Sequence, residues 1–180
     1  MKWRFAAKFL LTFAALVVVW QSLDVAVHYR RAALATARLL SPAVNGWALE
    51  YDRPGSQNAA SFHRVGRPAL PMLLELPALS MGLMPFLSLI VATPGLGWRR
   101  LALTAAGGMV LYFLIHVSVV LVYPLIMDQP NTFKDTLGVF SGLVAFVVAP
   151  LALWFILTYP ALRTLWRLSA PQPAGRTPLR

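Results

Sequence analysis

Residues 101–126 read LALTAAGGMVLYFLIHVSVVLVYPLI, and His116 is the only readily ionisable side chain among them. Two further apolar runs flank this one, at residues 72–93 and 136–159. A hydrocarbon layer of ~30 Å takes about 20 residues of helix, at about 1.5 Å per residue, so each run is long enough to cross it. The sequence therefore predicts an all-α integral membrane protein.

Composition supports the membrane class. The 180-residue chain is 58% hydrophobic and 12% charged, which is about half the charged share of an ordinary soluble protein. Its net charge of +10 would suggest nucleic acid in a soluble protein, but the basic residues flank apolar runs. Anionic lipid headgroups and topology signals explain them better, so we expect the lipid bilayer as a partner and no nucleic acid. The absence of cysteine excludes disulfides, thiolate metal sites and a cysteine nucleophile.

We expect a single transmembrane domain over residues 1–169 with four spans. The first span follows a basic N-terminal cap and is expected to remain uncleaved, because no convincing small-residue cleavage site follows it. The predicted spans cover about residues 5–27, 72–93, 101–126 and 136–159.

Residues 28–70 separate the first two spans and predict a small extramembrane insertion. A short helix is expected to stop at Ser41-Pro42, because proline disfavours a helical conformation in the residue before it. Residues 47–52 then alternate large apolar with small or charged side chains, and residues 61–65 would form the return strand of a hairpin. Residues 170–180 contain three prolines and no apolar run, which predicts a disordered basic tail.

The short basic turn Trp98-Arg99-Arg100 indicates the orientation. Arginines in short loops mark the cytoplasmic side, and the N-terminal cap is basic as well. We therefore expect a bacterial inner-membrane protein with both termini in the cytoplasm and residues 28–70 outside it.

Two side chains of the second predicted span are candidate catalytic groups. Glu75 lies about one turn into the span, where an ionised carboxylate costs a few kcal/mol unless it is paired. It would handle protons or contact a substrate; the stronger expectation is that it reaches water or Arg67 at the interface. Ser80 would need a base and an orienting group to act as a nucleophile, and no motif frames it, so helix packing is the stronger interpretation.

His116 is the third catalytic candidate. It shares one helix face with Gly108 and Tyr112, because these residues recur every four positions. A buried imidazole could act as a base, a ligand or a proton relay, although it is more often simply hydrogen-bonded. The histidines at positions 28, 63 and 116 have no metal-ligand spacing, so we expect no metal and no cofactor.

Glycines on the predicted spans are candidate helix-packing residues. Gly138 and Gly142 form a G-x-x-x-G motif, and Gly108 belongs to a Gly-Gly pair. Such residues let helices approach closely, either within this chain or in another protein. Packing within the chain is the default expectation.

The order of parts resembles the exosortase/archaeosortase family of membrane-embedded transpeptidases. The resemblance covers residues 5–158 in layout and is carried by three stretches. These are Ser41-Pro42-Ala43-Val44-Asn45-Gly46 before a strand, Leu79-Ser80-Met81-Gly82-Leu83 in a span, and the basic turn Trp98-Arg99-Arg100.

That resemblance implies a protein-sorting context, but its catalytic residues do not carry over. The family uses a cysteine before Ser/Ala-Gly-Leu, and Leu79 or Ser80 stands at that position here. The family's arginine has no counterpart in the later spans, and its histidine has none near residues 131–135. The chain is more similar to the small exosortase-associated membrane proteins that lack cysteine.

The sequence favours a non-catalytic inner-membrane protein over an enzyme. It would belong to an exosortase-type protein-sorting system and act through helix–helix contacts with a membrane-protein partner. The alternative is a degenerate membrane-embedded peptidase or transpeptidase with an outer-leaflet site near Glu75, Ser80 and His116. A transporter or channel component ranks last, because the spans are poor in polar residues and show no inverted repeat.

Overall fold

The apolar runs form helices in a computed structural model of the chain, which describes all residues except 1, 52–59, 72–81, 130 and 166–180. Helices satisfy their own backbone hydrogen bonds, as a segment in hydrocarbon must. The described elements are α1 (Lys2–Ser22), α2 (Val25–Val44), β1 (Ala48–Tyr51), β2 (Ala60–His63), β3 (Leu70–Pro71), α3 (Leu83–Ala92), α4 (Trp98–Met127), α5 (Thr132–Leu143), the π-helical turn η2 (Val144–Val148) and α6 (Ala149–Leu165).

Three helical stretches in the described part of the chain are long and apolar enough to cross a membrane. They are Trp3–Ser22 in α1, Trp98–Met127 in α4, and Thr132–Arg163, which joins α5, η2 and α6. The helical, membrane-type class predicted from the sequence is therefore confirmed.

The predicted second span is seen only in part. Residues 83–92 form α3, an apolar helix of 10 residues, which is too short to cross a bilayer by itself. Residues 72–81 lie outside the described part, and four spans therefore remain a prediction.

The first span differs from its predicted bounds, because α1 ends at Ser22 rather than continuing to residue 27. Asp24 adopts a left-handed conformation with φ 47° and ψ 36°, and α2 begins immediately after it. Aspartate is among the few residues besides glycine that tolerate this conformation. The sequence contains no glycine or proline at this point, so the break left no obvious signal.

The predicted helix stop at Ser41-Pro42 is also wrong, because α2 continues through Pro42 to Val44. Proline removes one helical hydrogen bond, but the following amides still find an acceptor. The amides of Asn45 and Gly46 both donate to the Ser41 carbonyl, and Gly46 has a positive φ of 73° that turns the chain away. Asn45-Gly46 is therefore the actual stop.

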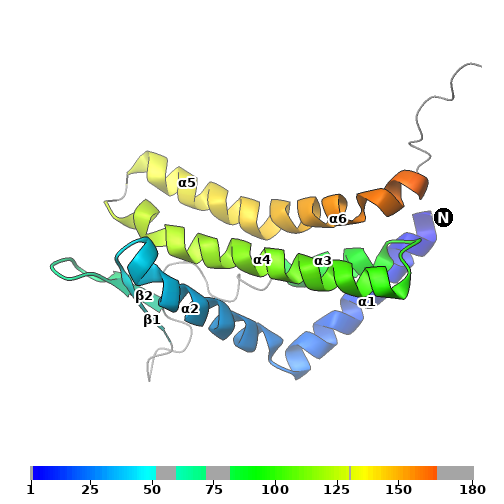
Figure 1. The fold of residues 1–180 in the computed structure, drawn as a ribbon, viewed down its shortest axis with the longest axis horizontal. Helices are drawn as coiled ribbons and strands as arrows, with labels where there is room; N and C mark the ends of the chain where they lie inside the picture. The colour runs from blue at the N-terminus through cyan, green and yellow to red at the C-terminus, as the bar shows by residue number, and fades with distance from the viewer. Residues whose placement is uncertain (1, 52–59, 72–81, 130, 166–180) are drawn as a thin grey trace, which may run out of the picture.

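The helices lie roughly side by side in an elongated molecule (Figure 1). α1 and α2 follow one edge with a bend between them, α4 runs along the middle, and α5 with α6 follows the other edge. The start of α1 and the end of α6 lie at the same end of the molecule, where the rings of Phe5 and Trp154 are 6.4 Å apart. The sheet lies at the opposite end.

The predicted hairpin is present and has a third strand. β1 pairs antiparallel with β2 in the register Leu49 to Phe62, and β2 pairs antiparallel with the two-residue β3. The third strand was not predicted, because two residues are too few for a pattern. Residues 52–59, which include the predicted turn, lie outside the described part.

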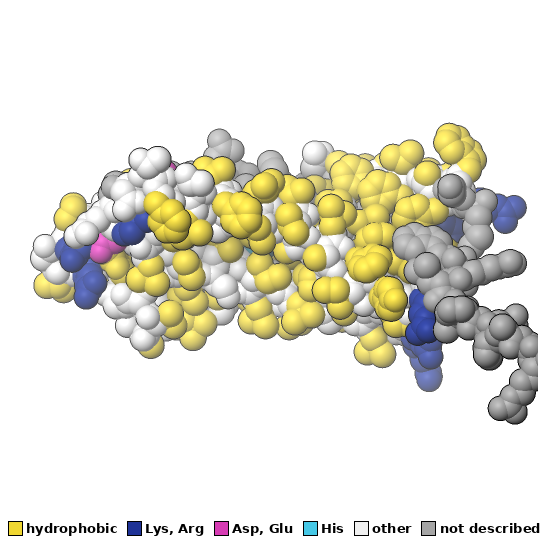
Figure 2. Space-filling view, turned by 90° about the horizontal axis from the view of Figure 1, so that it is seen from above, with side chains coloured by type: hydrophobic (Ala, Val, Ile, Leu, Met, Phe, Trp, Pro, Cys, Tyr) yellow, Lys and Arg dark blue, Asp and Glu magenta, His cyan; other side chains and the backbone are white. Residues whose placement is uncertain are grey.

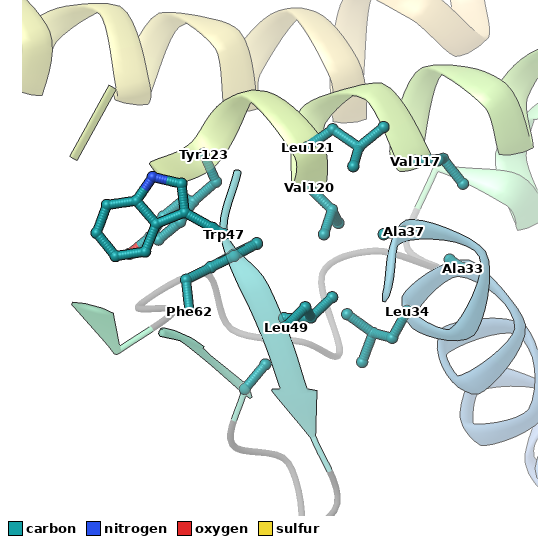
Figure 3. Packing of buried hydrophobic residues seen from close by; sticks show 11 residues of the cluster. Ala33, Leu34, Ala37, Trp47, Leu49, Phe62, Val117, Val120, Leu121 and Tyr123 are labelled. Atoms are coloured by element: carbon teal, nitrogen blue, oxygen red, sulfur yellow. The ribbon is translucent and has the colours of Figure 1, made fainter. Parts of the chain in front are cut away.

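The sheet packs against α2 and α4 around the larger apolar cluster (Figure 3). The sheet side contributes Trp47, Leu49 and Phe62 to this cluster. Asn45 links the end of α2 to α4 and to the start of the sheet. Its side-chain amide donates to the Leu121 carbonyl at 2.7 Å, and its side-chain oxygen accepts from the Trp47 amide. The cluster contains Ala33, Leu34, Ala37, Trp47, Leu49, Ala60, Phe62, Val117, Val120, Leu121 and Tyr123.

Candidate functional site

A hydrogen bond between two elements marks the polar centre of the helix bundle. The hydroxyl of Tyr29 on α2 lies 2.8 Å from Nδ1 of His116 on α4. His116 is fully buried, and the rings of Tyr112 and Phe146 pack against it at centroid distances of 4.2 and 5.4 Å. The imidazole is thus held in one orientation by a hydrogen bond and by aromatic packing.

Three buried polar atoms near this pair have no hydrogen-bond partner within the described part of the chain. They are Nε1 of Trp20, the hydroxyl oxygen of Tyr112 and Nε2 of His116. Trp20 and Tyr112 pack in one buried cluster with Leu83, and Tyr29 borders that cluster. Buried polar groups are normally paired, so we define Trp20, Tyr29, Tyr112 and His116 as the polar cluster and as a candidate site.

Two backbone features border the polar cluster. Gly82 lies against the Tyr112 hydroxyl so closely that a Cβ there would overlap it, and the same Cβ would lie 2.9 Å from the Phe146 carbonyl oxygen. Phe146 belongs to η2, the π-helical turn, which precedes Pro150 by two residues. π-Helical turns occur often at functional sites.

The predicted catalytic residues are only partly located. His116 lies in the polar cluster, while Glu75 and Ser80 fall in residues 72–81 and outside the described part. Arg67, suggested as a partner for Glu75, donates to both carboxylate oxygens of Asp128 at 2.6 Å. Whether Glu75 and Ser80 approach His116 therefore remains a prediction.

Serines on the described helices do not form a nucleophile–base pair with His116. The hydroxyls of Ser88, Ser118 and Ser141 each donate to a backbone carbonyl of their own helix. This pattern is typical of a structural serine in a helix. None of these three serines is therefore positioned by a hydrogen bond to His116.

A second imidazole–hydroxyl pair lies on the sheet. The Ser61 hydroxyl is 2.8 Å from Nε2 of His63, and Glu50 approaches that same nitrogen at 3.4 Å. A catalytic acid would instead hold the other nitrogen, Nδ1, and so fix the tautomer. The arrangement is therefore a cross-strand polar contact on a half-exposed surface rather than a catalytic triad.

The described residues contain no group of three or more His, Cys, Asp or Glu side chains that could hold a metal ion. Glu50 and His63 are a pair only, and the polar cluster holds a single imidazole. Metal chemistry consequently has no support from this part of the chain.

A groove between α4 and α5 contains the predicted G-x-x-x-G motif. Its volume is about 480 Å³, and it is lined by Gly138, Ser141 and Gly142 of α5 opposite Tyr123 and Met127 of α4. A second groove, of about 470 Å³, lies between Leu111–Ile126 of α4 and the residues Ser141 and Leu153. Both grooves border α5, and none of the described side chains of α5 is buried.

The three predicted packing glycines have different surroundings. A Cβ on Gly108 would overlap Phe86 of α3, so this glycine packs within the chain, as expected by default. A Cβ on Gly138 would lie 2.9 Å from the terminal carbon of Met127. A Cβ on Gly142 would meet only Phe146, one turn further along, at 3.9 Å. Within the described residues, Gly142 therefore has open space on its groove side.

Tyr29 and Trp20 were missed as site residues. The sequence places Tyr29 in the predicted extramembrane insertion, whereas its contact with His116 depends on α2 packing along α4. Trp20 lies in the predicted first span, and tryptophan is common where a span meets the interface. Trp20 became a candidate site residue only because its indole nitrogen is buried, and the sequence of one helix does not show which side chains are buried.

No protein-family model, curated protein or solved structure matches this chain.

Proposed function

We propose that this chain is a non-catalytic inner-membrane protein that binds a membrane partner of an exosortase-type protein-sorting system through helix–helix contacts. The sorting context comes from the resemblance in layout. The binding role is supported by the groove beside α5.

One observation carries the proposal: α5 and α6 form a spanning helix with a largely uncovered surface. Only 11% of its most apolar window is buried, against 44% for α4; the window of α1 is 0% buried, but neither groove borders α1. A helix that packs poorly against its own chain still presents small residues on one face, at Gly138, Ser141 and Gly142. In a bilayer, where van der Waals packing drives association, such a face suits the close approach of another helix.

The groove also offers a polar contact at its end. Asp135 lines the groove in the first turn of α5 and is exposed. The other acid nearby, Asp128, is already engaged by Arg67. A partner helix with a lysine or arginine near this end would therefore complement the groove in charge as well as in shape.

The test is photo-crosslinking in native membranes. A photoreactive residue at Val139, which lines the groove and is 77% exposed, should yield one reproducible protein adduct. The control is Leu103 on α4, which is 75% exposed and borders neither groove. Adducts with lipid alone at both positions would overturn the proposal.

A glycine pair supplies a matched test by substitution. Gly142→Leu should abolish the adduct, because its side chain would extend into the groove, where its Cβ meets only Phe146 at 3.9 Å. Gly107→Leu adds the same side chain to a helix glycine with nothing within 4 Å, outside the groove, and should leave the adduct intact. Loss of the adduct in both variants would indicate misfolding instead of a blocked groove.

The degenerate peptidase or transpeptidase is the second candidate, and one observation favours it. His116 is buried and held by Tyr29, as a positioned base would be. If Glu75 and Ser80 complete such a site, Ser80→Ala and Glu75→Gln should each abolish cleavage of a sorting-signal reporter. Normal cleavage in both variants would eliminate this candidate.

A further inference from the structure

The polar cluster holds three hydrogen-bond donors. We assign the Tyr29 hydroxyl as the donor to Nδ1 of His116, because a phenol is a better donor than acceptor, and this assignment places the proton of the neutral ring on Nε2. The Trp20 indole nitrogen is a donor only, and the Tyr112 hydroxyl has a proton of its own. None of these three donors has an acceptor among the described residues.

The backbone carbonyl of Phe146 lies near the Tyr112 hydroxyl and is a candidate hydrogen-bond acceptor. Pro150 has no amide proton, so the carbonyl of Phe146, four residues earlier, loses its α-helical donor. That carbonyl oxygen and the Tyr112 hydroxyl both lie within 3 Å of the position that a Cβ on Gly82 would occupy. The Tyr112 hydroxyl, one of the unpaired donors, thus lies close to the Phe146 carbonyl.

We propose that ordered water binds in the polar cluster: Trp20, Tyr112 and His116 donate to more than one water molecule, because each water accepts at most two hydrogen bonds, and one of these waters donates to the Phe146 carbonyl. Water is the smallest molecule that both accepts and donates, and a buried water typically makes about three hydrogen bonds to otherwise unsatisfied groups.

Bound water would extend the hydrogen-bonded path through His116. The path begins at Tyr29, which is partly exposed, enters the ring at Nδ1 and leaves it at Nε2 toward the water. Every member of the path then has a partner, which explains how three polar side chains remain inside an apolar bundle. This inference does not depend on the proposed partner protein.

Hydroxyl-radical footprinting by X-ray radiolysis, read out by mass spectrometry, tests the proposal in the purified full-length protein. Radicals form from ordered water and oxidise the side chains next to it, even where bulk solvent cannot reach. Tyr112 and Trp20 should be oxidised roughly tenfold faster than Phe86 if they contact an internal water. Phe86 is the matched control, since it is equally buried and stacks on Tyr112 at 6.1 Å but has no polar atom.

Trp47 reports on folding, because it is 1% exposed in the separate apolar cluster and should stay protected. His116→Phe should lower the oxidation of Tyr112 by removing one of the groups that hold the water. Oxidation of Tyr112 and Trp20 at the low rate of Phe86, with Trp47 protected, would overturn the proposal. Unchanged oxidation of Tyr112 in the folded His116→Phe variant would overturn the role of His116 in it.

Discussion

At the scale of single residues, His116 shows what an apolar environment demands of a polar side chain. Its ring is fully buried, and its own helix α4 is long and apolar enough to cross a membrane. An unsatisfied polar atom is expensive there, so the hydrogen bond from Tyr29 serves to keep the imidazole inside the bundle. The bond also ties α2 to α4, and His116 is therefore a structural link as well as a candidate for chemistry.

The strength of this link can be measured with a double-mutant cycle. Tyr29→Phe, His116→Phe and the double variant should show a coupling energy of about 1 kcal/mol, which lies within the range found for side-chain hydrogen bonds in membrane helices. The measurement is the free energy of unfolding in detergent or bicelles. Additive effects of the two substitutions would show that the 2.8 Å contact contributes nothing to stability.

Two adjacent glycines of α4 differ sharply in what surrounds them. Gly108→Ala should lower stability by about 1–3 kcal/mol, because the new Cβ overlaps the Phe86 ring and approaches Leu157 at 3.0 Å. Gly107→Ala is the matched control: nothing lies within 4 Å, and alanine favours a helix over glycine by about 0.5–1 kcal/mol in soluble hosts. Thermal unfolding of both variants checks this, and equal destabilisation would contradict the close approach of α3 to Gly108.

The sequence could predict only those residues of the candidate site that lie on one helix, α4. The four-residue spacing of Gly108, Tyr112 and His116 predicted that they share a helix face, and all three residues are buried. Tyr29 and Trp20 come from other helices, and nothing in their local sequence indicates which helix they meet. A partner set by tertiary packing leaves no periodic signal.

At the scale of elements, long apolar or alternating stretches predicted the helices and strands well. Breaks and ends that depend on one residue were not predicted. The spans over α4 and α5–α6 follow from runs of more than 20 apolar residues, and β1 follows from alternation. The break at Asp24 depends on one residue in a left-handed conformation. The helix continues two residues past Pro42 and ends where the Ser41 carbonyl accepts the amides of Asn45 and Gly46, an end point that the proline rule did not predict.

Asn45 joins three elements and should therefore influence more than its own turn. Asn45→Ala removes the donor to the Leu121 carbonyl and the acceptor for the Trp47 amide, and should cost about 1–3 kcal/mol because buried partners are left unpaired. Amide hydrogen exchange should accelerate in β1 and β2, since the sheet loses its link to α4. Asn131→Ala is the matched control, because Asn131 caps only α5 by accepting from the Lys134 amide at 2.9 Å. Unchanged exchange in the sheet of the Asn45 variant would show that apolar packing alone holds it.

At the scale of the whole molecule, charge gathers at the two ends of an apolar body. Figure 2 shows lysine and arginine side chains at both ends and a broad hydrophobic zone between them. Exposed leucines and valines of α1, α4 and α6 occur along the zone, as expected of surfaces that face lipid. We predict that the long axis crosses a membrane, because three helices are long and apolar enough to span one, and the side on which each end lies is predicted from the Trp98-Arg99-Arg100 turn.

The absence of cysteine makes this orientation directly testable, because one introduced cysteine gives one label. Val65→Cys places a thiol in the loop after β2, at a fully exposed position at the sheet end. Trp98→Cys places one at the start of α4, at the opposite end, where the side chain is 79% exposed. With the basic turn in the cytoplasm, a membrane-impermeant maleimide should label Val65→Cys in intact spheroplasts and Trp98→Cys only after lysis. The reverse labelling pattern would show that the protein has the opposite orientation. Labelling of both cysteine variants in intact spheroplasts would mean that α4 does not cross the bilayer.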